Sequence, residues 1–469
     1  MHHARKPRSL HRAAEITGQL RGPPQRGLLV GLTAASVGVI YGYDLSSIAG
    51  ALLFISREFG LTTRQQELLT TMVVFGQIAG AFGGGMLANA IGRKRSMVLI
   101  TVGYALFALL GAVSVSMPML LLARLLLGVT IGVSVVVVPV YVAESAPAAV
   151  RGSLLAAYQL ATVSGIILGY TAGYLLAGWQ AWRWMLGLAT VPALLLLPLL
   201  LRVPDTARWY LLKGRVAEAR QALLRIEPEA TVDAELAEIV CATSEEGRGG
   251  ISEMLRRPYL RATLFVVALG FLIQITGINA IVYYSPRLFA AMGFQGDFAL
   301  LALPALVQVA GLAAVCASLL LVDRLGRRPI LLSGIAMMIV AVVLLIVVFA
   351  ADSGAILGFA GVLLFIIGFS FGFGSLVWVY AGESFPSRLR SMGSSVMLTS
   401  NLTANALIAG FFLTMLHLLG GTGVFAAFGF FAVVAFAVVY RYAPETKGRQ
   451  LEDIRHFWEN GGHWENPCP

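Results

Sequence analysis

Twelve long apolar runs restrict the fold of this chain more than any other feature of its sequence. A helix that crosses the hydrocarbon core of a bilayer, about 30 Å thick, needs about 20 apolar residues. With 58% hydrophobic and 12% charged residues, the chain is too apolar for a soluble domain. We therefore predict an all-α membrane protein with twelve transmembrane helices. The runs lie near residues 27–50, 67–89, 97–116, 119–143, 153–178, 184–201, 262–286, 298–321, 330–351, 356–381, 391–416 and 420–440.

Basic residues are distributed unevenly between the two ends of these runs. All but five of the 34 lysines and arginines lie in the N-terminal tail, the loops after even-numbered runs and the C-terminal tail. Segments rich in these residues stay in the cytoplasm, so we predict a protein of the plasma membrane with both termini in the cytoplasm. The exceptions are Arg57, Arg64, Arg183 and Arg287 in the other loops and Arg124 inside a run.

The net charge of +10 does not require a nucleic-acid partner. Membrane topology and attraction to anionic lipid explain it, and no basic cluster alternates with stacking aromatic residues. Cys241, Cys316 and Cys468 have no suitable disulfide or metal partner in the sequence. No phosphate loop or set of metal ligands is present, so we expect no cofactor and no enzymatic activity.

Three pairs of motifs repeat at nearly the same offset along the chain. They follow runs two and eight, four and ten, and six and twelve, so the chain consists of two parallel six-helix repeats. Such a layout is typical of major facilitator proteins, which bind substrate near the membrane midplane between the halves. The pairs are Gly92-Arg93-Lys94-Arg95 with Gly326-Arg327-Arg328-Pro329, Glu144 and Arg151 with Glu383 and Arg390, and Pro204-Asp205-Thr206 with Pro444-Glu445-Thr446.

The repeat divides the chain into five segments. A long polar linker separates the halves, and its windows 215–226 and 232–242 have helical spacing. They are either solvated spacers or a latch that touches the transmembrane halves. The segments are a cytoplasmic tail (1–26), an N-terminal half (27–201), the linker (202–261), a C-terminal half (262–442) and a second cytoplasmic tail (443–469).

Asp44 and Arg124 are charges inside apolar runs of the first half. A lone charge in hydrocarbon is costly, and two opposite charges offset each other. A carboxylate whose surroundings change between two states of a protein can bind and release a proton. The alternative is a static structural ion pair.

Neutral amides also occur inside apolar runs. Amides recognise hydroxyl groups, and an aromatic ring such as that of Trp378 recognises the C–H face of a sugar. Each amide alone could instead join two helices. The set consists of Gln159, Gln274, Asn279, Asn401 and Asn405.

With these motifs in order, the chain resembles the sugar porter family of the major facilitator superfamily over residues 27–454. Its cytoplasmic loop signature is similar to Asp323-Arg324-Leu325-Gly326-Arg327-Arg328, and its seventh-helix motif to Gln274-Ile275-Thr276-Gly277-Ile278-Asn279 with Tyr283-Tyr284. The resemblance implies a proton site at Asp44 with Arg124 as its partner. It implies a sugar site of Gln159, Gln274, Asn279, Tyr283, Phe369, Trp378 and Asn401, and gating salt bridges among Arg93, Glu144, Arg151, Arg327, Glu383 and Arg390.

Beside mild changes at Asp205 and Ala207 in the motif after run six, the chain departs from the family pattern at three places. Asn89 and Ala90 replace the Asp-Arg pair of the first loop signature, which predicts a weaker latch there. Ile273 stands where the family usually has a glutamine, and Ser375 stands where it usually has a proline. Loss of the amide at Ile273 removes a hydroxyl partner and predicts a different substrate preference or a lower affinity.

We therefore expect a monomeric secondary transporter that imports a monosaccharide with a proton by alternating access. Two alternatives stay open. One is a passive sugar or polyol facilitator in which Asp44 and Arg124 are structural. The other is a sugar sensor without transport, for which the tail after Leu451 is short.

Overall fold

The structure is a computed structural model that describes most of the chain. The described residues are 23–145, 151–226, 229–246, 251–257, 259–351, 354–385, 387–447, 454, 456–458, 460 and 464. Within these residues the regular secondary structure is entirely helical. This agrees with the prediction of an all-α membrane protein. Inside a bilayer there is no water to bond the backbone, and a helix satisfies its own backbone N–H and C=O groups.

Eight helices of the described residues build the N-terminal half, hereafter the N-half. The first transmembrane span combines α2 and α3, and the sixth combines α8 and α9; the other spans are single helices. Their bounds are α2 Pro23–Ala35, α3 Val37–Glu58, α4 Thr63–Ile91, α5 Arg93–Ala112, α6 Met117–Ser145, α7 Arg151–Ala177, α8 Trp182–Gly187 and α9 Thr190–Arg202, followed by the linker helix α10 Ala207–Leu212.

The rest of the linker and the C-terminal half, hereafter the C-half, follow the same pattern with more breaks. The seventh span combines α14 and α15, and the tenth combines α18 and α19. The bounds are α11 Val216–Leu224, α12 Glu229–Glu246, α13 Ile251–Met254, α14 Leu260–Ile275, α15 Ile278–Ala291, the π-helical turn η1 Phe298–Ala302, α16 Leu303–Leu325, α17 Arg327–Ala351, α18 Ala355–Phe371, α19 Phe373–Glu383 and α20 Ser387–Tyr442.

The prediction of twelve spans is confirmed. Eleven helical stretches of the described residues are long and apolar enough to cross a membrane, and the last of them, Met392–Tyr442, has 51 residues. It turns at Gly420, whose φ of 65° breaks the helix geometry, so it supplies spans eleven and twelve. The first span was predicted to end near residue 50, but it continues to Glu58. Its last turn is polar, and its backbone still forms helical hydrogen bonds.

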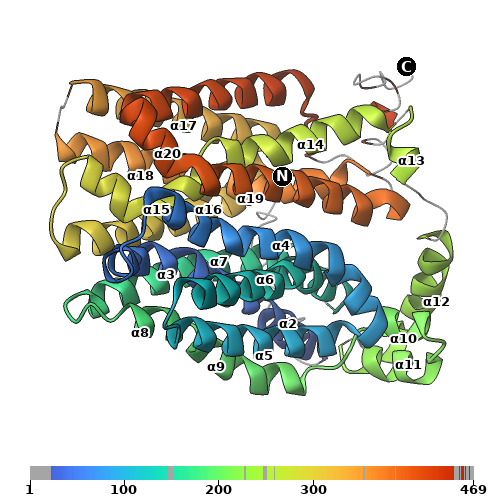
Figure 1. The fold of residues 1–469 in the computed structure, drawn as a ribbon. Helices are drawn as coiled ribbons and strands as arrows, with labels where there is room; N and C mark the ends of the chain where they lie inside the picture. The colour runs from blue at the N-terminus through green and yellow to red at the C-terminus, as the bar shows by residue number, and fades with distance from the viewer. Residues whose placement is uncertain are drawn as a thin grey trace, which may run out of the picture.

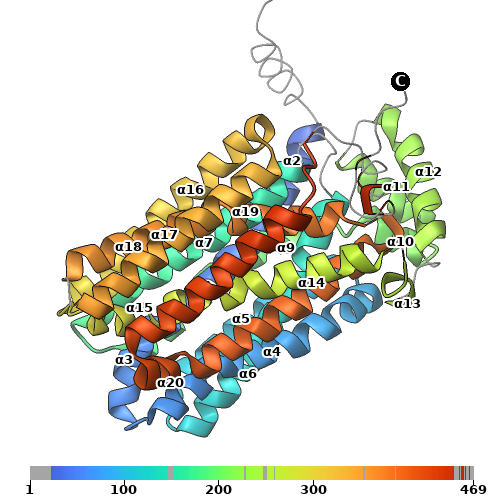
Figure 2. The same cartoon turned by 90° about the horizontal axis from the view of Figure 1, so that it is seen from above.

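The two halves form two layers of roughly parallel helices (Figure 1). Helices α10–α13 lie at one end of the bundle, which we call the linker face; the loops after α3, α7 and α15 lie at the other end, the opposite face (Figures 1 and 2). Helices α11 and α12 occupy the two linker windows predicted to be helical. They pack with α10 through a small apolar cluster of Ala207, Ala219, Ala222, Leu223 and Val232.

A close helix crossing fixes the position of the Asp44 segment. A Cβ atom added at Gly42 would lie 1.8 Å from the backbone oxygen of Thr162, so only glycine allows α3 to approach α7 here. Gly165 packs with equal closeness on α3, since its Cβ would lie 2.2 Å from the oxygen of Val39. The α3–α7 pair is therefore a rigid part of the N-half.

Candidate functional site

The carboxylate of Asp44 in α3 and the guanidinium of Arg124 in α6 form a buried ion pair. Arg124 Nη1 donates to Asp44 Oδ1 at 2.5 Å, and each residue is only 2% exposed. The prediction that the two would pair is therefore confirmed in geometry. Both groups are desolvated, so removing either would leave the other as an uncompensated buried charge.

Two tyrosines hold α3 in register beside this pair. Tyr43 Oη donates to the backbone oxygen of Met185 in α8 at 3.0 Å, and Tyr104 Oη of α5 donates to the oxygen of Ile40 at 3.0 Å. All three helices belong to the N-half. Asp44 is therefore anchored within one half and does not depend on contacts across the interface.

The seventh span is interrupted near the middle of its length. Gly277 adopts φ 97°, which glycine tolerates at little cost, and a Cβ there would lie 2.4 Å from the Phe428 ring. The break lies between Gln274 at the end of α14 and Asn279 in the first turn of α15. It turns both amides toward α20.

Amides of the seventh and eleventh spans form two separate hydrogen-bonded groups, which together we call the amide cluster. Gln274 Nε2 donates to Asn401 Oδ1 at 3.2 Å, and Asn279 Nδ2 donates to Asn405 Oδ1 at 2.9 Å. Asn405 Nδ2 reaches Tyr283 Oη at 3.5 Å. Gln274 Oε1 is buried and has no hydrogen-bond partner among the described residues, so it can accept from a ligand hydroxyl. Four predicted sugar-site residues thus meet: Gln274, Asn279, Tyr283 and Asn401.

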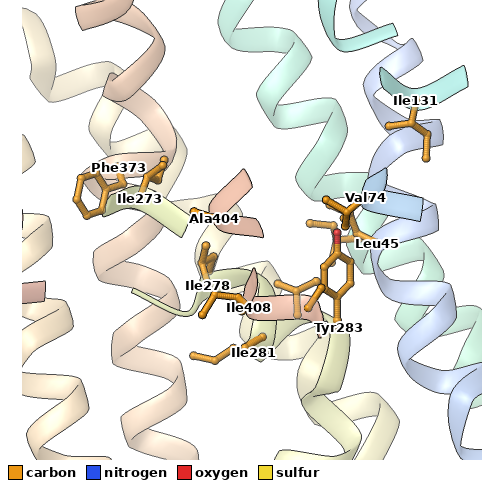
Figure 3. Packing of buried hydrophobic residues seen from close by; sticks show 14 of the residues in the cluster. Leu45, Val74, Ile131, Ile273, Ile278, Ile281, Tyr283, Phe373, Ala404 and Ile408 are labelled. Atoms are coloured by element: carbon orange, nitrogen blue, oxygen red, sulfur yellow. The ribbon is translucent and has the colours of Figure 1, made fainter. Parts of the chain in front are cut away.

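Apolar residues surround the amide cluster and extend across the interface. Tyr283 belongs to the same buried cluster as Leu45 of α3 and Val74 of α4, and Figure 3 shows these three residues in one view. Ile273, where the family has a glutamine, is 4% exposed. It fills its position with hydrocarbon and offers no group to a hydroxyl.

The tenth span is also broken, at Gly372 between α18 and α19. Ser375, at the usual proline position, donates its hydroxyl to the backbone oxygen of Ser370 at 2.7 Å. The serine therefore satisfies a carbonyl that the break exposes. Trp378, six residues after Gly372, is 41% exposed, while Phe369 is half-buried and packs on Phe373 with ring centroids 6.3 Å apart.

Three predicted sugar-site residues are not joined to the amide cluster. Gln159 in α7 is half-buried, and none of the hydrogen bonds of the described residues links Gln159, Phe369 or Trp378 to the cluster. Their roles stay predictions. The described residues also contain no group of three or more histidine, cysteine or acidic side chains placed to hold a metal.

Comparison with known proteins decides the family. Residues 30–458 match the family model described as "Sugar (and other) transporter". The chain belongs to this sugar transporter family. It is 33% identical to the galactose-proton symporter of Escherichia coli over 90% of this chain and 92% of the relative. It is also 33% identical to the probable polyol transporter 4 of Arabidopsis thaliana, over 90% of this chain and 83% of that one.

Solved structures show the same fold. The proton:xylose symporter XylE bound to 6-bromo-6-deoxy-D-glucose superimposes with a TM-score of 0.79 at 25% identity, covering 93% of this chain and 99% of that one. XylE from E. coli in a partially occluded inward-open conformation gives a TM-score of 0.80 at 23% identity, with 91% and 100% covered. The transporter described here therefore has the twelve-helix major facilitator fold.

The opposite face of this sugar transporter is closed by hydrogen bonds between the halves. Glu67 in α4 is 0% exposed, and it accepts from Thr414 N at 2.6 Å and Thr414 Oγ1 at 2.8 Å. Arg64 pairs with Glu67 at 3.3 Å and donates to the backbone oxygen of Gly410 at 2.7 Å. These four residues join α4 to α20, and we call them the α4–α20 latch.

Further contacts close the same face of the transporter. Arg287 Nη2 of the C-half donates to Ser56 Oγ at 2.9 Å and to Gln66 Oε1 at 3.0 Å, both in the N-half. Deeper in the membrane, Tyr170 Oη of α7 donates to the backbone oxygen of Val282 in α15 at 2.5 Å.

Sequence reasoning missed this closure. The sequence identifies Arg64 and Arg287 only as two of the four basic residues in the loops at this face. A signal was present, because Arg64 and Glu67 stand three residues apart at the start of a span, where they share one helix face.

At the linker face, each half uses one carboxylate to cap a helix. Asp205 Oδ1 accepts from Arg93 N at 3.0 Å and from Lys94 N at 3.3 Å, at the start of α5. Glu445 accepts from Arg327 N at 3.0 Å and from Arg328 N at 3.1 Å, at the start of α17. A carboxylate at a helix N-terminus satisfies free amides and the helix dipole. The repeated motifs thus perform one structural task twice.

The predicted gating residues lie around these caps. Arg93 makes a two-point pair with Glu144 at 3.0 and 3.1 Å, inside the N-half. Arg93 Nη1 also donates to Asn89 Oδ1 at 3.1 Å, as Arg327 donates to Asp323 Oδ1 at 3.3 Å in the C-half. Glu383 is half-buried at the end of α19. The side chains of Arg151 and Arg390 lie outside the described residues, so their predicted salt bridges are untested.

Proposed function

We propose that this protein imports a monosaccharide together with a proton by alternating access across the plasma membrane. The observation that carries the proposal is the buried Asp44–Arg124 pair. A carboxylate that is fully desolvated beside one arginine changes its charge when that arginine moves. A galactose-proton symporter and a proton:xylose symporter among the similar proteins support proton coupling.

The linker face is placed in the cytoplasm under this proposal. The arginines of both loop signatures, including Arg93 and Arg327, lie there, and basic loops stay on the cytoplasmic side. The α4–α20 latch then closes the outer face. The conformation is accordingly inward-facing, with sugar released toward the linker face.

The transport cycle uses the two halves for different tasks. In the outward-facing state, Asp44 takes up a proton and its bond to Arg124 loosens. Sugar then binds to the amide cluster, with Gln159 and Trp378 completing the site from α7 and α19. The halves rock, the α4–α20 latch forms, and sugar and proton leave to the cytoplasm.

A polyol is the second candidate substrate. The observation that favours it is Ile273, because a buried isoleucine cannot bond a hydroxyl that a glutamine would bind. Polyol transporters occur among the relatives of the chain. A linear polyol can turn different hydroxyls toward the remaining amides, whereas a pyranose ring holds its hydroxyls in fixed positions.

Uptake into proteoliposomes tests the proposal. Purified full-length protein is given D-galactose, D-glucose, D-xylose or D-sorbitol, with and without an imposed pH gradient, as wild type and Asp44→Asn. We expect the wild type to concentrate one or more of these compounds only with the gradient. Asp44→Asn should exchange labelled for unlabelled substrate but accumulate none. Wild-type uptake that ignores the gradient would instead identify a passive facilitator.

A further inference from the structure

A small cavity lies beside the Asp44–Arg124 pair, inside the N-half. Besides the two charged residues, its lining includes Ser47 of α3, Gly111 of α5 and Leu186 of α8. It offers about 10 Å³ of room for the centre of a water molecule, close to the 10–15 Å³ that one water needs. The cavity is therefore of the size that one water molecule occupies.

The two charged lining residues carry buried polar atoms without partners. Asp44 Oδ2, Arg124 Nε and Arg124 Nη2 are buried and make no hydrogen bond among the described residues. Ser47, 2% exposed, adds a hydroxyl that donates to its own helix at 3.3 Å and keeps its oxygen free to accept. Buried polar atoms in proteins nearly always find a partner, and a buried water needs two to four. The pair supplies both donors and an acceptor.

We infer that this cavity binds one water molecule that bridges Asp44 Oδ2 and the Arg124 guanidinium. The water donates to the carboxylate oxygen and accepts from an arginine N–H. It thereby stabilises the charged form of Asp44 in the inward-facing state. The inference rests on the proposed function, in which Asp44 carries the proton.

The site is separate from the path of the sugar. All of its lining comes from the N-half, from helices α3, α5, α6 and α8 and from Ala189 between α8 and α9, whereas the amide cluster belongs to the C-half. The cavity and the amide cluster therefore have no lining residue in common. When Asp44 gives its proton to solvent water, which leaves as hydronium, Oδ2 becomes an anionic acceptor and its hydrogen bond to the bridging water strengthens. Proton release is therefore favoured by a partner that remains in place.

Gly111→Ala is the variant that removes the space. A Cβ atom at Gly111 would lie 3.9 Å from Ala123 Cβ and 3.9 Å from Leu186 Cδ1, both in the cavity wall, so alanine fits without a clash. Gly85→Ala is the matched control, because a Cβ at Gly85 meets nothing within 4 Å. Ser47→Ala is a second variant that removes a polar partner and adds no volume.

Gradient-driven uptake measured over a series of internal pH values tests the water site, with the sugar of the panel that the wild type accumulates. In Gly111→Ala and Ser47→Ala, we expect half-maximal uptake at an internal pH about one unit higher, equivalent to about tenfold weaker proton release. Gly85→Ala should match the wild type. Sugar exchange without a gradient should stay within about twofold in every variant, since it needs no net proton release.

An unchanged internal-pH profile in both cavity variants would overturn the water site while leaving proton coupling intact. If Gly111→Ala lacks sugar exchange, it has lost its fold, and Ser47→Ala alone decides. Wild-type uptake that ignores the gradient would contradict the proposed function instead, so the two failures are distinct.

Discussion

At the linker face, Asp205 in the N-half and Glu445 in the C-half cap the first turns of α5 and α17 through the same pair of backbone amides. In the middle of the membrane the halves differ. The N-half buries the Asp44–Arg124 pair, whereas the C-half buries neutral amides around Asn405. The two halves therefore cap equivalent helices in the same way, but they bury different polar groups in their interiors.

The difference separates two kinds of recognition. A buried ion pair can respond to a proton, because protonating the carboxylate strongly weakens its attraction to the arginine in a low-dielectric interior. Neutral amides suit hydroxyls, which need both donors and acceptors. Placing them in different halves lets relative motion of the halves connect proton binding to sugar binding.

Arg124→Leu is expected to have the largest effect. It leaves Asp44 buried without a partner, which should lower the free energy of unfolding by about 3–5 kcal/mol. Asn279→Leu in the C-half removes a neutral hydrogen bond and should cost only about 1–2 kcal/mol. Unfolding in detergent with added denaturant measures both. The double variant Asp44→Asn/Arg124→Leu should recover much of the loss; equal costs for the two single variants would remove the energetic contrast between the halves.

Glu67→Gln tests what holds the halves together at the opposite face. Hydrogen bonds to a charged acceptor are worth about 1.5–3 kcal/mol, so the outward-open population should rise by about 10- to 150-fold. Spin labels at Val115 and Ile356, which are 77% and 87% exposed, report the distance between the halves after the three native cysteines are replaced.

Glu58→Gln is the control for this measurement. Glu58 pairs with Arg183 at 2.8 Å on the same face, but both residues belong to the N-half. Its loss should leave the distance distribution unchanged. A shift as large as that of Glu67→Gln would show that charge on this face, and not the α4–α20 latch, sets the conformation.

Asn405→Leu tests whether the amide cluster binds sugar without controlling the proton. Asn405 bonds Asn279 at 2.9 Å and reaches Tyr283 at 3.5 Å, so its loss disorders the amide cluster. The KM for sugar should rise about tenfold, equal to about 1.4 kcal/mol, while the dependence on the pH gradient persists. Initial uptake rates at several sugar concentrations measure this. Loss of gradient dependence would mean that the amide cluster also controls the proton.

Asn89→Asp makes the first loop signature resemble the second and should have the smallest effect. It gives Arg93 the partner that Asp323 gives Arg327, and pairs of this kind contribute about 0–1 kcal/mol. Unfolding in detergent should show a small gain for Asn89→Asp and a small loss for Asp323→Asn. A gain well above this range would show that the N-half loop is the weaker joint.

Much of this arrangement could be predicted from the sequence. The spans were readable because a bilayer offers no alternative partner for backbone groups, so each span must be apolar along its own length. Asp44 and Arg124 stood out for the same reason, and their pairing follows from the cost of isolated charge. The first span was underestimated because its last turn, at Glu58, is polar.

The opposite-face closure was not predicted, since its residues are ordinary polar groups at the ends of spans. Glu67 is exceptional only because α20 covers it and Thr414 points at it. The roles of Asp205 and Glu445 were likewise hidden: the repeat located them, but no local signal showed that their carboxylates return to α5 and α17.

The sequence by itself therefore determined the number of spans, the two-fold repeat and the presence of one ionic pair, because the membrane imposes these constraints residue by residue. The tertiary structure decided that Asn279 meets Asn405, that Glu67 meets Thr414, and that a water-sized cavity adjoins Asp44. These features depend on how helices far apart in the chain pack against one another, and packing is a property of neighbours that no single segment specifies.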